Sequence, residues 1–235
     1  MKKILFINGC VRENSRTLEL ASYVLTKIDG EIEEVKLYDL ELKALDINGL
    51  QMRDVAKKNN DYSDKMFDFA KQFKKADVIV IAVPYWDLMF PAVLKNYFET
   101  ITISGLTFTY GENGIPKGLC VAKKLIYITT SGGSIIYNFG YDYVEALAKN
   151  FFGINEVKFI SAQGLDIYGS DVSGILEGKK IITINDFIEL VDLRDTLDKP
   201  ILHLKVNEIK NAFYVEDIDK VYEYIIKESQ FENKE

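Results

Sequence analysis

Residues 78–83 read Val-Ile-Val-Ile-Ala-Val, and Pro84 follows them directly. Six consecutive apolar residues, most of them β-branched and ended by a proline, are typical of a strand that is buried on both faces. Such strands belong to parallel sheets, because the crossover connections of a parallel sheet place helices over both faces. This stretch therefore predicts the centre of an α/β domain.

The segments on either side of this strand repeat the same alternation. Apolar runs alternate with stretches whose apolar residues recur at helical spacing, which indicates strand and helix in turn five times over. This is the order of a doubly wound five-stranded parallel sheet with helices on both faces. The other strands are expected at residues 3–7, 34–38, 124–130 and 157–160, and the helices around residues 18–28, 66–73, 94–101 and 144–151.

Two stretches depart from this pattern. Residues 41–63 lack clean periodicity and are expected to form a long loop that contains a short helix. We expect residues 1–185 to form the sheet domain and residues 186–235 to form a C-terminal extension, packed on that domain or on a partner subunit. Short strands at 181–184 and 201–206 and a last helix at 218–225 are expected toward the end of the chain.

Composition argues against several classes of protein. Of 235 residues, 36 are acidic and 29 basic, a formal charge of −7, and no basic run exceeds a Lys-Lys pair, so no nucleic-acid partner is expected. Cys10 and Cys120 form no Cys-x-x-Cys pair, which argues against a zinc site or a disulfide framework and for a reducing, cytoplasmic setting. No apolar run approaches a membrane span, and His203, the one histidine, is a poor catalytic candidate.

Three loops should meet beyond the carboxyl ends of the strands, where sheets of this kind bind their ligands. The first, residues 9–17, combines a tight turn, hydroxyl groups, the guanidinium groups of Arg12 and Arg16, and the free N–H groups of a helix start. That combination suits a phosphate group. The alternative is a plain helix cap made by Asn14 or Ser15.

The other two loops offer aromatic rings and glycines. Residues 84–89 read Pro-Tyr-Trp-Asp-Leu-Met and place rings after the central strand, where they can flank a planar heterocycle; the alternative is an aromatic anchor in the core. Residues 130–134 read Thr-Ser-Gly-Gly-Ser. Paired glycines allow close approach to backbone N–H groups, although such a pair is often only a turn.

Several familiar signatures are missing. No Gly-x-Gly-x-x-Gly follows the first strand and no Gly-x-x-x-x-Gly-Lys occurs, which argues against a dinucleotide fingerprint and a nucleotide P-loop. The first and third strands run into Asn8 and Pro84 rather than into acidic residues, which argues against a phosphoacceptor domain. No pair of carboxylates is placed for hydrolytic chemistry.

Taken together, the three loops resemble those of the flavodoxin-like NAD(P)H:quinone oxidoreductases, in particular the FMN-dependent azoreductases. The resemblance rests on residues that fall in that family's order and spacing, at positions 84–91, 94–98, 105–110, 118–119, 123–124, 132–133, 153–154 and 157–159. It implies a flavodoxin-like sheet in the order 2-1-3-4-5. It also implies FMN as cofactor, NADH or NADPH as electron donor, and a quinone, azo or nitro aromatic compound as acceptor. Hydride would pass through flavin N5 in a ping-pong exchange, so no side chain would be catalytic.

The resemblance also assigns residues to the site. The FMN phosphate would lie in the first loop, the isoalloxazine beside the second, and its pyrimidine edge beside the third. Family members are typically homodimers with the substrate slot at the subunit interface. The cofactor-binding candidates are Cys10, Arg12, Ser15, Arg16, Thr17, Pro84, Tyr85, Trp86, Asp87, Leu88, Thr130, Ser131, Gly132 and Gly133, and the slot or interface candidates, with plain core as the alternative, are Phe108, Tyr110 and Phe151.

Some positions depart from the family pattern. Asp87 stands where asparagine is usual, and Leu88 where an aromatic residue is usual. An ionised Asp87 beside the ring would disfavour the anionic reduced flavin, because like charges repel. Cys10 and Glu13 stand in the first loop where small or basic residues are commoner.

Two other functions fit the same fold. A flavodoxin-type electron carrier would pass single electrons to protein partners and would oxidise almost no NAD(P)H with a quinone. A flavin-free binding or scaffold protein would fail to retain FMN.

Overall fold

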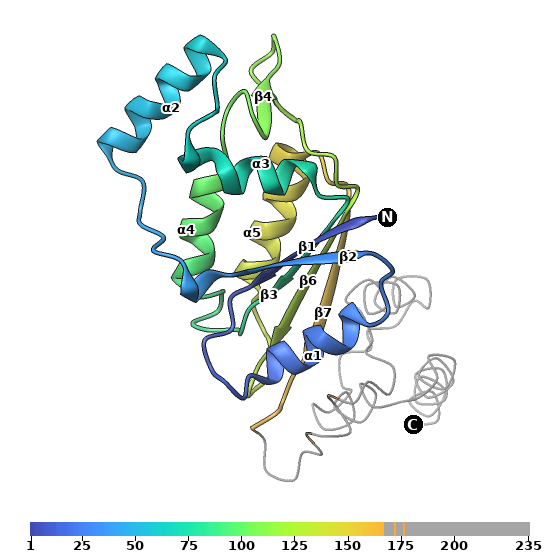
Figure 1. Cartoon of the computed structure of the whole chain (residues 1–235). Helices are drawn as coiled ribbons and strands as arrows, with labels where there is room; N and C mark the ends of the chain where they lie inside the picture. The colour runs from blue at the N-terminus through green and yellow to red at the C-terminus, as the bar shows by residue number, and fades with distance from the viewer. Residues whose placement is uncertain (167–171, 173–175, 177–235) are drawn as a thin grey trace, which may run out of the picture.

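The structure, a computed structural model, describes residues 1–166 together with Val172 and Leu176. At its centre lies a five-stranded parallel sheet in the order β2-β1-β3-β6-β7 (Figure 1). Counted along the chain, these are the first to fifth strands of the sheet, so the predicted α/β class and the order 2-1-3-4-5 are confirmed. The strands are β1 (Lys3–Asn8), β2 (Glu31–Lys36), β3 (Val78–Ala82), β6 (Lys124–Thr130) and β7 (Glu156–Ala162).

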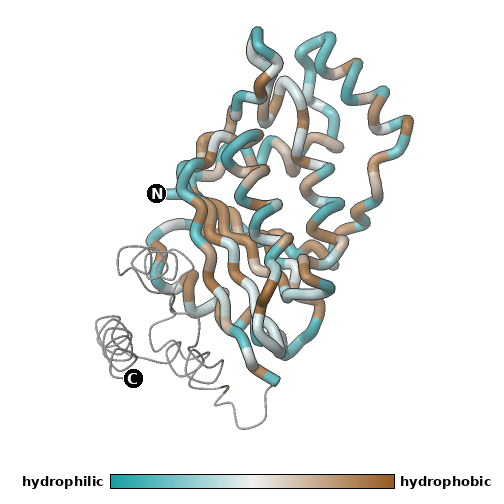
Figure 2. Tube along the Cα trace, turned by 180° about the vertical axis from the view of Figure 1, so that it is seen from behind, coloured by the Kyte–Doolittle hydropathy of each residue, from teal (hydrophilic) through white to brown (hydrophobic). Residues whose placement is uncertain are grey.

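Helices cover both faces of the sheet. α1 (Arg16–Leu25) lies on one face, where Leu20 and Val24 share a buried cluster with Ile4 and Phe6 of β1. On the other face, α3 (Asp68–Lys75), α4 (Ala92–Ile101) and α5 (Phe139–Leu147) share a second cluster with the alternate strand residues. Successive strand residues point to opposite faces, so unbroken apolar strands supply both clusters. Figure 2 shows the strands of the sheet largely in brown, whereas brown and teal residues alternate along the helices.

Two elements near the first strand pair differ from expectation. β2 begins three residues earlier than the predicted 34–38 and ends at Lys36, because Leu37–Asp39 turn into a short 3₁₀ helix. α1 ends at Leu25, with Thr26 at its C-cap, whereas the helical spacing was expected to continue to residue 28. The strand and the helix therefore lie in the predicted regions, with their bounds shifted.

α2 (Ile47–Asn59) is a helix of 13 residues within the stretch that was expected to be mostly loop. Asp46 caps its start by accepting a hydrogen bond from the N–H of Gly49 at 2.8 Å. Ala56 is the one residue of α2 that is buried. A helix that buries so little has no apolar stripe, so its periodicity was not visible in the sequence.

A hairpin and a π-helical turn complete the described fold. β4 (Phe108–Tyr110) and β5 (Pro116–Gly118) pair in antiparallel fashion near the amino ends of the main strands, at the top of Figure 1. α5 begins at Phe139, earlier than expected, and continues into a π-helical turn (Ala148–Phe152). Gly153, with φ of 74°, ends it.

The expected division at residue 185, the strands at 181–184 and 201–206, the helix at 218–225 and His203 lie outside the described residues. The division into a domain and an extension therefore stays a prediction. In the part of the chain that the structure describes, no helix has the length and apolar character needed to cross a membrane. Residues 1–166, Val172 and Leu176 also contain no group of three or more His, Cys, Asp or Glu side chains suited to hold a metal ion.

Candidate functional site

The three predicted loops meet at the carboxyl edge of the sheet, at the bottom of Figure 1. Main-chain hydrogen bonds carry the strand pairing into them: the N–H of Gly9 donates to Ala82 O at 2.8 Å, and the N–H of Tyr85 donates to Thr130 O at 3.1 Å. The ends of β1, β3 and β6 are therefore held side by side. This edge is where doubly wound sheets bind ligands.

The first loop runs from β1 into the start of α1. Ser15 is the N-cap of α1, because its Oγ accepts a hydrogen bond from the N–H of Leu18 at 3.2 Å. The structure is thus compatible with both interpretations of this loop, the plain helix cap and the phosphate site. Ser15 caps the helix, and the first turn still has N–H groups without partners inside the helix, which a phosphate could accept from. Arg12 is exposed in the loop, and Arg16 is the first residue of the helix.

Cys10 and Thr17 are held inward by hydrogen bonds. The Cys10 N–H donates to Asn8 Oδ1 at 2.9 Å and its Sγ lies 3.6 Å from Ala82 O. Burial raises the pKa of the Cys10 thiol, so the protonated form is favoured and the group is a poor nucleophile. Thr17 Oγ1 lies 2.6 Å from Thr130 Oγ1 in a buried contact that ties α1 to the end of β6.

The second loop closes on a tight two-residue turn. The N–H of Trp86 donates to Met89 O at 3.0 Å and the N–H of Met89 donates back to Trp86 O at 2.8 Å. Between them, Asp87 and Leu88 have φ of 51° and 68°. A turn with two left-handed residues favours Asn and Gly, tolerates Asp and strains Leu. This turn would accommodate the asparagine that the resemblance implies at position 87, and it tolerates the aspartate that stands there.

The side chains of the second loop differ in exposure. Pro84 and Tyr85 are half-buried, whereas Trp86 and Leu88 are 38% and 46% exposed. Tyr85 reaches toward the third loop, where its hydroxyl donates to Tyr137 O at 2.6 Å. The one tryptophan is therefore a surface ring at the sheet edge, which favours a ligand-flanking role over a core anchor.

The third loop presents main-chain donors on one side. The carbonyl oxygens of Ser131, Gly132 and Gly133 accept hydrogen bonds from the N–H groups of Leu165 (3.2 Å), Asp166 (3.0 Å) and Gly164 (3.1 Å). In a trans peptide the following N–H points opposite to the carbonyl, so the N–H groups of residues 132–134 point away from that turn. A Cβ added to Gly133 would meet no atom within 4 Å.

These observations fit FMN. The N–H groups of residues 132–134 can donate to the acceptor atoms of a pyrimidine edge, and the position of a Cβ on Gly133 is free of contacts within 4 Å. The first turn of α1 with Arg12 and Arg16 suits a phosphate. Residues 84–88 supply the rings beside them.

Three residues that the sequence analysis passed over stand at the same edge. Ile136, Tyr137 and Phe139 are 81%, 61% and 53% exposed, and the rings of Tyr137 and Phe139 stack with centroids 5.9 Å apart. Large apolar side chains gathered at an open edge are typical of a binding surface. The signal in the sequence was the group of apolar and aromatic residues that begins two positions after the paired glycines, at Ile135.

The candidates for the substrate slot, Phe108, Tyr110 and Phe151, lie at the amino edge of the sheet, opposite the three loops of the same chain. The Phe108 ring packs edge-on against those of Tyr110 and Phe151, with centroids 5.3 and 5.0 Å apart. Phe108 is buried, Phe151 is partly buried and Tyr110 is 53% exposed. The fold thus does not bring these rings to the three loops of the same chain.

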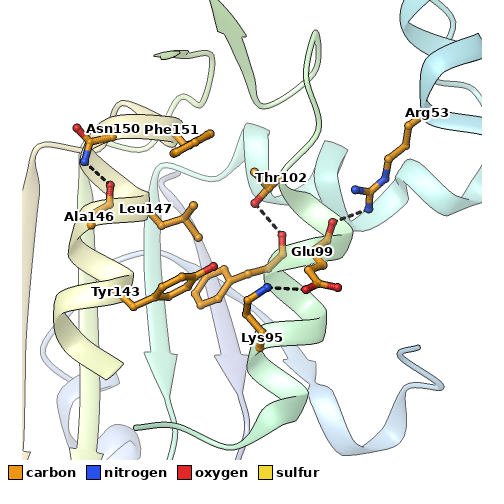
Figure 3. Close-up of a pocket in the computed structure, with 10 residues that line it drawn as sticks. Arg53, Lys95, Glu99, Thr102, Tyr143, Ala146, Leu147, Asn150 and Phe151 are labelled. Carbon is orange, nitrogen blue, oxygen red and sulfur yellow. Dashed lines mark hydrogen bonds and ion pairs between the residues drawn. The ribbon is translucent and has the colours of Figure 1, made fainter. Parts of the chain in front are cut away.

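Phe151 also lines a depression of about 410 Å³ between α4 and α5 (Figure 3). Lys95 pairs with Glu99 there, and Arg53 of α2 donates to the main-chain O of Glu99. The hydrogen bond from Lys95 lowers the pKa of Glu99. The depression is therefore lined by the Lys95–Glu99 ion pair and by apolar side chains of α4 and α5. It lies on the α4–α5 face, away from the three loops.

Comparisons with known proteins identify the fold family and several similar proteins. A protein-family model described as a flavodoxin-like fold matches residues 2–181. An "FMN-dependent NADH:quinone oxidoreductase" of Coprothermobacter proteolyticus is 36% identical over 188 residues, covering 73% of this chain and 91% of the relative. A protein of the same name from Lachnoclostridium phytofermentans is 35% identical over 191 residues, covering 77% and 96%. The crystal structure of an FMN-dependent NADH-azoreductase from Bacillus anthracis in complex with FMN has a TM-score of 0.61 and 25% identity, covering 85% of this chain and 100% of that chain.

Proposed function

The chain belongs to the flavodoxin-like fold family, and from that premise we propose that it is an FMN-dependent NADH:quinone oxidoreductase that also reduces azo compounds. The observation that carries the proposal is the meeting of three loops at the carboxyl edge, where the carbonyls of Ser131, Gly132 and Gly133 are bound on one side and a Cβ at Gly133 would meet no atom within 4 Å. The names of the two relatives support the same activity, and the match with this chain extends over nine-tenths or more of the length of each relative.

Each loop has a distinct task in this proposal. The first turn of α1, with Arg12 and Arg16, binds the phosphate through N–H groups and positive charge. Tyr85 and Trp86 flank the isoalloxazine, and Gly132 and Gly133 donate to its pyrimidine edge. Bound FMN supplies two-electron redox chemistry between NADH and the acceptor.

The exposed rings at the same edge suit the acceptor. Tyr137 and Phe139 present a flat apolar surface beside Tyr85, whose hydroxyl is fixed to the main chain of Tyr137. A planar uncharged quinone or azo compound buries apolar area against such a surface. We therefore add these two residues to the acceptor site.

We also propose that the chain acts as a homodimer. Phe108, Tyr110 and Phe151 lie at the far edge from the cofactor loops, so they can line the flavin of a second copy but not that of their own chain. The exposed Tyr110 and the depression between α4 and α5 supply surface for such contact. Sedimentation of the purified chain tests this, and a Tyr110→Asp variant that sediments as a monomer would support it, whereas a monomeric parent would refute it.

Two finer points complete the proposal. The free cysteines Cys10 and Cys120 support a cytoplasmic setting, because a reducing compartment keeps thiols free. NADPH is proposed as a second donor beside NADH.

The deciding experiment is an absorbance spectrum of the chain after incubation with FMN and desalting, followed by anaerobic NADH or NADPH and then a quinone. Retained flavin bands that bleach with the nucleotide and return with the quinone are expected, and the faster nucleotide identifies the preferred donor. Bands that persist with both nucleotides would point to an electron carrier instead. Loss of all flavin on desalting would refute the cofactor assignment.

A further inference from the structure

One carboxylate, that of Asp166, touches two parts of the candidate cofactor site. Its Oδ1 accepts a hydrogen bond from Nη1 of Arg16 at 2.6 Å, and the same nitrogen donates to Leu165 O at 3.3 Å. Arg16 is the first residue of α1, so its guanidinium belongs to the helix start that is proposed to bind the phosphate. In this structure that cation is turned toward a protein carboxylate.

The second contact is with Gly132 in the third loop. The N–H of Asp166 donates to Gly132 O at 3.0 Å, and a Cβ added to Gly132 would lie 2.2 Å from Asp166 Oδ2. The carboxylate therefore rests against the backbone of a residue that the proposed function assigns to the pyrimidine edge. One negative charge therefore contacts a residue from each of the two loops that are proposed to hold the cofactor.

We propose that Asp166 competes with the FMN phosphate for Arg16 and so lowers the affinity of the site for FMN. This inference rests on the proposed function. A carboxylate and a phosphate seek the same guanidinium N–H groups, and each repels the other when both stand beside it. FMN is then an exchangeable cofactor in this chain.

The exposure of the pair makes the competition possible. The side chains of Arg16 and Asp166 are 41% and 71% exposed, so water screens their attraction and the pair is weak. A phosphate carries more charge than a carboxylate and can draw Arg16 away. Asp166 retards FMN binding without preventing it.

Removal of the charge tests the inference. Asp166→Asn keeps the size of the side chain and an acceptor oxygen but removes the repulsion. We expect the dissociation constant for FMN, measured by flavin fluorescence on the apoprotein, to fall about three- to fivefold. Riboflavin lacks the phosphate, so its dissociation constant should stay unchanged. Glu19→Gln is the matched control, because it removes an equal charge from the first turn of the same helix.

A double-mutant cycle identifies Arg16 as the residue through which Asp166 acts. Arg16→Gln should weaken FMN binding, and in that background Asp166→Asn should change it no more than Glu19→Gln does. An unchanged or weaker affinity for FMN in Asp166→Asn would overturn the inference, as would an equal gain for riboflavin or an undiminished gain in Arg16→Gln. If no variant and no parent chain bound FMN, the proposed function itself would fail.

Discussion

The two edges of the sheet are built in opposite ways. At the amino edge, the backbone of Gly118 in β5 lies directly against that of Phe152 and Gly153, and Phe73 and Phe152 pack with ring centroids 4.7 Å apart. At the carboxyl edge, exposed apolar side chains and two left-handed residues are left facing outward. The amino edge also exposes Tyr110 and Ile115, so the contrast lies in the tight backbone contact of one edge and the strained turn of the other. Close packing serves stability, whereas local backbone strain is typical of functional sites.

The largest effect is expected at the amino edge. In Gly118→Ala the new Cβ would lie 2.1 Å from the carbonyl carbon of Phe152 and 2.2 Å from the N of Gly153, and backbone atoms cannot move aside easily. We expect the free energy of unfolding in urea to fall by about 3 kcal/mol or more.

Gly114→Ala in the turn of the same hairpin is the matched control for this loss. Its φ of 75° strains an alanine, but a Cβ there would meet no atom within 4 Å, so a loss of about 1 kcal/mol is expected. Equal losses in the two variants would show that the amino edge is not rigid.

The second effect belongs to the carboxyl edge and has the opposite character. In Gly133→Ala the methyl group projects into the open space proposed for the flavin. Because the methyl group meets no protein atom, the free energy of unfolding of the apoprotein should change by less than about 0.5 kcal/mol. Because it occupies space proposed for the flavin, the dissociation constant for FMN should rise about tenfold. A stability loss with unchanged FMN binding would reverse the assignment of the two edges.

The third effect concerns the acceptor. Replacing both Tyr137 and Phe139 by alanine removes the stacked pair, and we expect the KM for a flat naphthoquinone to rise about fivefold, since such ring contacts contribute about 1 kcal/mol. Ferricyanide, which is small and charged, should be reduced at the parent rate. A similar fall in rate with both acceptors would place these rings outside the acceptor site.

The smallest effect probes the strain of the second loop. Leu88 has φ of 68°, which strains a leucine but not a glycine. Leu88→Gly relieves that strain but also makes the unfolded chain more flexible, so we expect the free energy of unfolding of the apoprotein to rise by only about 0.5 kcal/mol. Ile136→Gly, at an exposed position of the same edge whose φ is not positive, should not stabilise the chain. Destabilisation by Leu88→Gly would mean that the turn is not strained.

Much of the fold and the three-loop site followed from local patterns. The apolar runs of β1, β3 and β6 are long because both faces of these strands are buried, so the strands could be recognised in the sequence. Sheet order came from the resemblance. The full length of α2 was not predicted because this helix buries little apolar surface. The hairpin of β4 and β5 was not predicted because strands of three residues show almost no periodicity.

The sequence by itself determined the alternation of strand and helix, and with it the edge at which the loops after β1, β3 and β6 meet, because burial on two faces leaves a continuous apolar run. Only the tertiary structure decided which side chains face one another across that edge. The Arg16–Asp166 pair joins residues 150 positions apart, and Thr17 meets Thr130 across 113. Contacts over such separations depend on strand order and loop geometry, which no local pattern encodes.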